Sequence, residues 1–167
     1  MALSEQFLDH EEIHPIDLVE HIAEHHAWEF DRIHDDQIAM AVVGQWRSYS
    51  ITLAWSGYDE TLRLICTFEM EPPKERLPAL YEALNVINDQ CWAGAFTFWG
   101  EQQMMVYRYG LVLAGDQAPT PDQIDTMINA AVMSCERYYP AIQLVTWAER
   151  SPEEAVQVAI AEAYGRA

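Results

Sequence analysis

Residues 46–70 read WRSYSITLAWSGYDETLRLICTFEM and decide the fold. Large apolar side chains occupy alternate positions before and after Ser56-Gly57: Tyr49, Ile51, Leu53, Trp55, Leu62, Leu64, Cys66 and Phe68. A period of two is that of a strand with one buried face, and a turn this short joins neighbouring antiparallel strands. The stretch therefore predicts a β-hairpin with one apolar face.

The same alternation continues on both sides of this hairpin. Two shorter segments precede it, and a later pair of strands is joined by a turn at Gly100. The six predicted strands are 28–33, 37–44, 46–55, 61–70, 95–99 and 103–113. The turns between the first four are too short for crossover helices, so these strands should pair antiparallel as a meander, and the last two as a hairpin.

Apolar residues at helical spacing predict four helices. The first spans residues 15 to about 27 and the second spans 77–91. The third and fourth begin after Thr120 and Ser151, which each precede a Gln or Glu by three residues and so form capping boxes. Pro140 should stop or kink the third helix, because proline lacks the amide donor that a helix interior needs.

The order of helix, four strands, helix, two strands and two helices indicates a single α+β domain over residues 14–167, behind a short acidic arm at 1–13. We expect an antiparallel sheet of about six strands with its helices packed on one face. The opposite face is short of large apolar groups and should meet water or a second subunit. The predicted protein-binding or dimer surface consists of Trp46, Ser48, Ser50, Thr52, Tyr58, Arg63, Thr67 and Arg108.

Charge limits the classes of partner. The chain has 27 acidic against 9 basic residues, a net charge of −18, which repels nucleic acid and anionic membrane surfaces. No apolar run approaches the roughly 20 residues that cross a bilayer, and residues 1–8 lack a signal-peptide pattern, so we expect a cytoplasmic protein. Cys66, Cys91 and Cys135 lie in apolar patterns typical of buried, reduced thiols.

Motifs that carry chemistry are scarce in this sequence. It contains no glycine-rich phosphate loop and no G-x-S-x-G nucleophile elbow, so we predict no catalytic residue, no cofactor and no enzymatic activity. Asp17, His21 and His25 repeat at intervals of four and are the weak candidates for a metal site. The alternative is a solvated acidic helix face, with His26 satisfied in the core.

Several short stretches together resemble one protein family. They are Phe30-Asp31-Arg32, Ala54-Trp55, NDQCWAGAF at 88–96, the strand that contains Arg108, CERYYPA at 135–141 and SPEEA at 151–155. The chain from Pro15 to Ala167 resembles the YbjN family of bacterial sensory-transduction regulators. Ala95 and Tyr109 depart from the family pattern, which often has histidine at these positions.

The resemblance implies a fold similar to that of type III secretion chaperones, which are small acidic homodimers that hold an extended segment of a partner protein. It implies neither a reaction nor a cofactor. Together with the acidic charge, it leads us to expect a non-enzymatic, cytoplasmic protein-binding module, chaperone-like or regulatory, that acts as a homodimer on another protein. The alternative is a metal- or small-ligand-binding protein that uses the histidines and Asp17 of the first helix.

Overall fold

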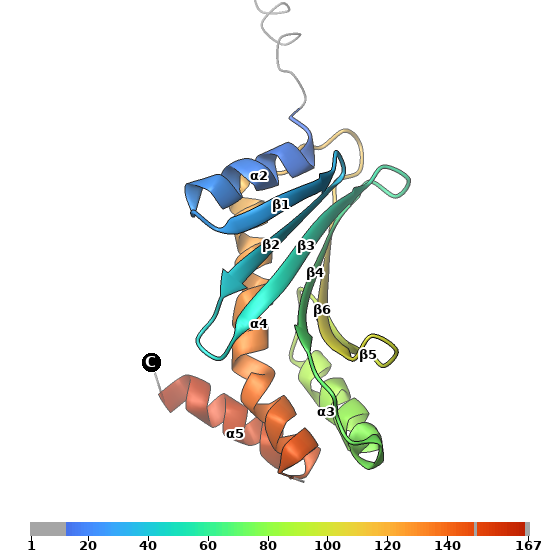
Figure 1. The fold of residues 1–167 in the computed structure, drawn as a ribbon, viewed down its shortest axis with the longest axis vertical. Coiled ribbons are helices and arrows are strands. Elements are labelled where there is room, and N and C mark those ends of the chain that lie inside the picture. Colours follow the sequence, from blue (N-terminus) through green and yellow to red (C-terminus); the bar gives the residue numbers. More distant parts are fainter. Residues whose placement is uncertain (1–12, 149, 166–167) are drawn as a thin grey trace, which may run out of the picture.

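The computed structural model describes residues 13–148 and 150–165, with side chains up to residue 160. Apart from Ile13, the acidic arm predicted at 1–13 lies outside the described residues. The elements follow the predicted order (Figure 1): α2 (Pro15–His25), β1 (Glu29–His34), β2 (Gln37–Val43), β3 (Ser48–Ser56), β4 (Thr61–Glu69), the 3₁₀ turn η1 (Lys74–Arg76), α3 (Leu77–Asp89), β5 (Ala95–Trp99), β6 (Met104–Val112), α4 (Pro121–Trp147) and α5 (Pro152–Gly165).

The strands form one antiparallel sheet in the order β1-β2-β3-β4-β6-β5, which confirms the predicted meander and hairpin. The register aligns the inward side chains into rows that cross the sheet. One row consists of Phe30, Met40, Ile51, Cys66, Tyr107 and Phe96. Its members from Met40 onward are buried, so the alternation in the sequence marks the core face correctly.

The helices cover this inner face in the arrangement that the sequence predicts. In Figure 1, α4 runs the length of the sheet behind it. It contacts β4 and β6, whereas α2 covers β1 to β3 and α3 contacts β5. The last helix, α5, packs on α3 and α4. The core therefore lies between one sheet face and a layer of helices, and the opposite sheet face is left outside it.

Local capping fixes where the last two helices begin. The Thr120 hydroxyl accepts the Gln123 amide at 3.1 Å, and the Gln123 side chain accepts the Thr120 amide at 2.9 Å, as expected for a capping box. The hydroxyl of Ser151 accepts the amide of Glu154 at 3.3 Å. Pro140 does not stop α4, which continues to Trp147 because buried residues beyond the proline still pack into the core.

Two expectations about side chains need correction. His26 is not a core residue: its ring stacks on Trp28 at the surface, with centroids 4.4 Å apart, and its Nε2 lies 3.1 Å from a carboxylate oxygen of Asp125 in α4. Cys66 and Cys135 are free and buried, with their sulfurs 3.7 Å apart, but Cys91 is only half-buried. The hydrogen-bond partner of His26 lies on a helix that is remote in sequence, so the local pattern did not indicate it.

Candidate functional site

The outer face of the sheet carries most of the residues that the sequence assigned to a protein-binding or dimer surface. Ser48, Ser50, Arg63 and Arg108 are exposed there, and Thr52 is half-buried. Thr67 has the same orientation but is only 7% exposed, so it contributes little accessible surface. The exposure of these side chains indicates that the described helices, which bury the inward-facing residues of the same strands, leave this part of the outer face open.

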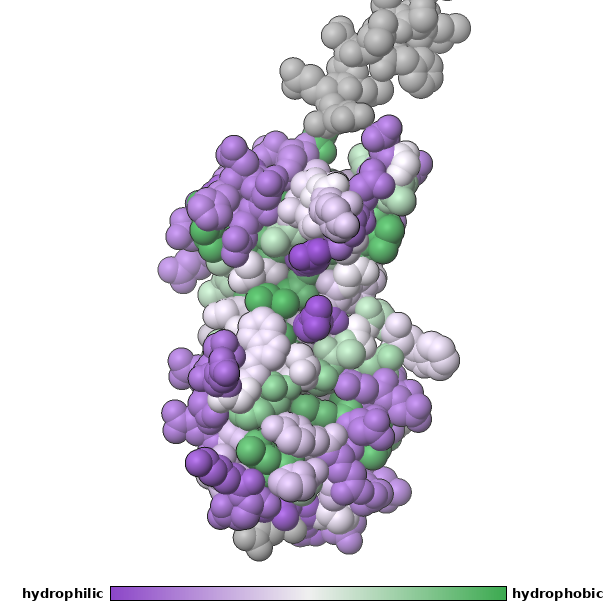
Figure 2. All heavy atoms as spheres, turned by 90° about the vertical axis from the view of Figure 1, so that its right-hand side faces the viewer, coloured by the Kyte–Doolittle hydropathy of each residue, from purple (hydrophilic) through white to green (hydrophobic). Residues whose placement is uncertain are grey.

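The acidic residues of this face lie mainly on the edge strand β1, which carries the exposed Glu29 and Asp31. Strands β2 to β6 contain a single carboxylate, Glu69 at the end of β4, in a chain that has 27 acidic residues. They also contain two arginines, Arg63 and Arg108, of which Arg63 pairs with Asp59 at 2.6 Å. Figure 2, which views the molecule from the side of β5, β6 and α3, shows a mostly pale and green middle with isolated purple residues, and larger purple areas toward both ends. The part of the outer face that β2 to β6 form therefore carries little negative charge, whereas its β1 edge carries two carboxylates.

The two aromatic residues predicted at the rim lie at opposite ends of β3. Tyr58, in the turn to β4, is 99% exposed. Trp46, in the turn from β2, is 42% exposed and stacks on Tyr139 of α4, with ring centroids 6.3 Å apart. Trp46 therefore lies toward the helical layer and not on the outer sheet face, whereas Tyr58 projects into solvent.

The weak metal candidates are not gathered into a site by the fold. Asp17 forms an ion pair with Arg32 at 3.0 Å, and His21 is largely exposed and lies 3.7 Å from Glu24. Within residues 13–148 and 150–160, no group of three or more His, Cys, Asp or Glu side chains is arranged to hold a metal ion. Helical spacing alone aligns His21 and His25, but a specific site needs further ligands from other elements.

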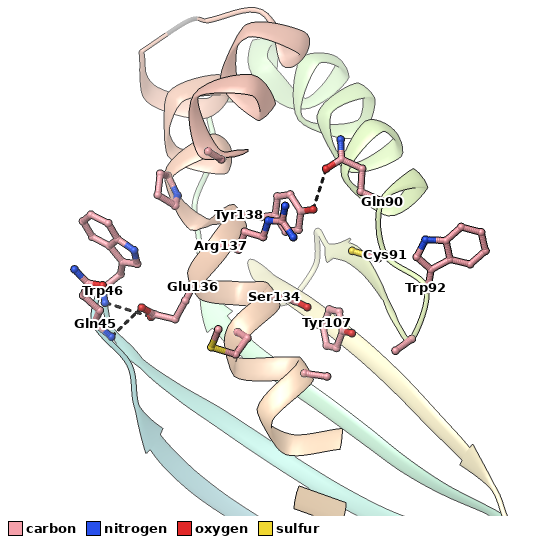
Figure 3. A pocket seen from close by; sticks show the side chains of 15 residues that line it. Gln45, Trp46, Gln90, Cys91, Trp92, Tyr107, Ser134, Glu136, Arg137 and Tyr138 are labelled. Carbon is pink, nitrogen blue, oxygen red and sulfur yellow. Dashed lines mark hydrogen bonds between the residues drawn. The ribbon is translucent and has the colours of Figure 1, made fainter. Parts of the chain in front are cut away.

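A cavity of about 720 Å³ is the feature that the sequence did not reveal. It lies over α4 and extends from the β2–β3 turn to the loop between α3 and β5 (Figure 3). Its lining residues are Gln45, Trp46, Gln90, Cys91, Trp92, Ala93, Tyr107, Ala130, Met133, Ser134, Glu136, Arg137, Tyr138, Pro140 and Ala159. Ligand sites in proteins commonly have volumes of about 300–1,000 Å³ and mostly apolar walls.

Glu136 anchors the β2–β3 turn at one end of this cavity. Its carboxylate accepts the amides of Gln45 and Trp46 at 2.9 and 3.2 Å and the hydroxyl of Tyr49 at 2.6 Å. Gly44 permits this approach, because a Cβ there would overlap both the carboxylate and the Tyr49 ring. One helix residue thereby holds the turn against α4, because its carboxylate accepts hydrogen bonds from three donors.

The wall beyond α4 is built by the segment that joins α3 to β5. The Asn88 side chain donates to the Phe96 carbonyl at 3.0 Å and accepts its amide at 2.7 Å, in the manner of a short neighbouring strand. Gln90 accepts the hydroxyl of Tyr138 at 3.0 Å. The guanidinium of Arg137 lies 5.4 Å from the centre of the Tyr138 ring, a cation–π distance. These contacts hold Arg137 and Tyr138 in a fixed arrangement.

Burial and the Glu136 carboxylate raise the pKa of Tyr49 well above 10. Folding therefore favours the neutral phenol of Tyr49 over the phenolate. The contribution of this tyrosine to the free energy of unfolding is complete below pH 10 and is lost as pH rises beyond it. Between about pH 9 and pH 11, the wild type should lose about 1.4 kcal/mol more unfolding free energy than Tyr49→Phe. Urea unfolding at both pH values measures this difference, and parallel losses in the two proteins would contradict it.

Both the sequence and the fold of the chain are similar to those of known proteins. Residues 15–144 match the family model YbjN, described as "Putative bacterial sensory transduction regulator". The chain belongs to the YbjN family. A crystal structure of the E. coli YbjN protein, whose title calls it "a putative transcription regulator", has a similar fold with a TM-score of 0.52 and 11% sequence identity. The similarity covers 80% of this chain and 90% of that one, and no curated protein matches the sequence.

Three of the stretches that resemble YbjN proteins meet around the cavity. Residues 88–96 form one wall, Tyr107 beside Arg108 contributes from β6, and residues 135–141 contribute from α4. The family resemblance therefore marked the stretches that line the cavity, but no pattern in the sequence showed that these stretches lie around the same cavity. The description of the YbjN family names a regulatory role. No helix in the described part of the chain has the length and apolar character needed to cross a membrane.

Proposed function

We propose that this YbjN protein is a cytoplasmic, non-enzymatic regulator that binds another protein in the manner of a chaperone and acts as a homodimer. One observation carries the proposal: an uncovered sheet face on which strands β2 to β6 hold a single carboxylate, in a chain whose net charge is −18. The family description supports a regulatory role.

Electrostatics favours this face for self-association. Two copies that each carry a charge of −18 repel each other, and the repulsion is smallest where the approaching surfaces lack carboxylates. Strands of up to nine residues, five of them side by side, present roughly 600–700 Å², given rises of about 3.3 Å per residue and spacings of about 4.8 Å. This area is close to the roughly 800 Å² per partner of a standard interface.

The oligomeric state tests the dimer directly. We expect the wild type to sediment with about twice the monomer mass of 19.2 kDa, and Ser50→Glu to sediment as a monomer. Ser50 is exposed on β3, between Ala41 and Thr67 in the register, so an added carboxylate there falls within the proposed contact without disturbing the core. Sedimentation velocity over a range of concentrations is the measurement.

Val158→Glu is the matched control, because Val158 is 41% exposed on α5, away from the sheet face. It adds the same charge and should remain dimeric. A monomeric wild type, or a dimer that tolerates Ser50→Glu, would overturn the dimer proposal. Circular dichroism of each variant shows whether the fold is retained.

Binding of a second protein is proposed at the rim of the sheet, where Tyr58 presents an almost fully exposed ring. Aromatic side chains of this kind are enriched among the residues that dominate binding energy at protein interfaces. The wild type should retain partner proteins from a native lysate, and Tyr58→Ser should lose them, while Tyr81→Ser, an exposed tyrosine on α3, should retain them. A lysate that yields no retained protein would count against this part of the proposal.

A further inference from the structure

The cavity over α4 combines aromatic walls with one cationic side chain, Arg137, that no carboxylate among the described side chains neutralises. Trp92 is 97% exposed and Met133 is 68% exposed, so large apolar groups face the open space. Figure 3 shows the indoles of Trp46 and Trp92 on opposite sides of α4, with Arg137 and Tyr138 between them. Exposed apolar groups that converge on a hollow are typical of a binding site.

Arg137 has no ion-pair partner within 4.0 Å among the described residues. This is unusual in a chain with three times as many acidic as basic residues, 27 against 9. Its neighbour Glu136 does not neutralise it. Successive helix residues point about 100° apart, and the Glu136 carboxylate is held by the β2–β3 turn on the other side of α4.

The Cys91 thiol, which also lines the cavity, is unable to form an ion pair with Arg137 at neutral pH. Burial raises the pKa of the Cys91 thiol by more than the positive charge of Arg137 lowers it. The thiol therefore stays protonated and does not compensate the charge of the guanidinium. The ring of Tyr138, itself fixed by Gln90, holds the guanidinium from one side and leaves its N–H donors available.

We propose that this cavity binds a small organic acid, with its carboxylate on Arg137 and its aromatic or aliphatic body along the wall that Met133 and Trp92 form. A guanidinium matches a carboxylate through two parallel hydrogen bonds. A single cation in a strongly acidic protein favours a monoanion over a phosphate dianion, which needs more positive charge. The site lies on the helical side of the molecule, so this inference stands independently of the proposed sheet contact.

Matched acids and amides test the chemistry. The probes are indole-3-propionate and octanoate, each compared with its primary amide by isothermal titration calorimetry on the full chain. We expect saturable binding of at least one acid, one site per protomer, with its amide binding about tenfold more weakly because it lacks the charge-assisted hydrogen bonds. Quenching of tryptophan fluorescence should follow the same isotherm, because Trp46 and Trp92 line the cavity.

The substitution Arg137→Met should lower the affinity for the acid about tenfold and leave the amide unchanged. Arg108→Met, on the outer face of the sheet, is the control and should preserve acid binding. Arg137→Lys keeps the charge but loses the paired donors, and should give an intermediate affinity with an intact fold. Equal binding of acid and amide, acid preference that survives Arg137→Met, or no saturable binding of either acid would overturn the proposal.

Discussion

Replacing Glu136 with alanine should lower the free energy of unfolding by about 3 kcal/mol. The substitution removes three hydrogen bonds to one carboxylate, but these bonds differ in value. The amides of Gln45 and Trp46 are exposed enough for water to replace the lost acceptor. The Tyr49 side chain is completely buried, so its hydroxyl would lose a short bond to a charged acceptor, which accounts for most of the expected effect.

Thermal unfolding measures this loss as a melting temperature lower by about 6–12 °C for a chain of this size. Glu136→Gln keeps an acceptor for Tyr49 and should lose about half as much. Glu82→Ala removes an exposed carboxylate from α3 and should stay within about 0.5 kcal/mol of the wild type. If Glu136→Ala and Glu82→Ala were equally stable, the carboxylate would not be the anchor of the β2–β3 turn.

Local patterns were enough to predict the strands and helix starts. In β3 and β6 every second residue is large and apolar, so the buried face is determined by residues two positions apart. The capping boxes at Thr120 and Ser151 depend on groups only three residues apart. Where the interacting groups are close in sequence, the physical cause of the structure can be read from the sequence.

The cavity escaped prediction because its walls come from elements that are remote in sequence. Glu136 reaches Gln45 over 91 residues, and Tyr138 reaches Gln90 over 48. His26 shows the same limit: an apolar helix face suggested burial, whereas Asp125, 99 residues away, holds its ring at the surface. Periodicity reports whether a side chain faces inward, but it does not report which other element lies opposite.

Gly94 is the residue at which a single added methyl group should have the second large effect. A Cβ at this position would lie 2.5 Å from the carbonyl oxygen of Arg108 and 2.5 Å from the Tyr107 ring. The ring could turn aside, but the carbonyl belongs to β6 where it pairs with β5, so relief requires the backbone to shift. Gly94→Ala should therefore lower the free energy of unfolding by about 2–3 kcal/mol.

Gly100→Ala provides the control, because a Cβ at Gly100 meets no atom within 4 Å. It should leave stability unchanged or raise it by up to about 1 kcal/mol, since alanine restricts the unfolded chain. Urea unfolding of both variants separates the loss of backbone freedom, which they share, from the steric overlap, which only Gly94→Ala has. Equal stabilities would mean that the 88–96 segment shifts freely over β6, in which case Tyr107 and the cavity wall beside it would not be held in one position.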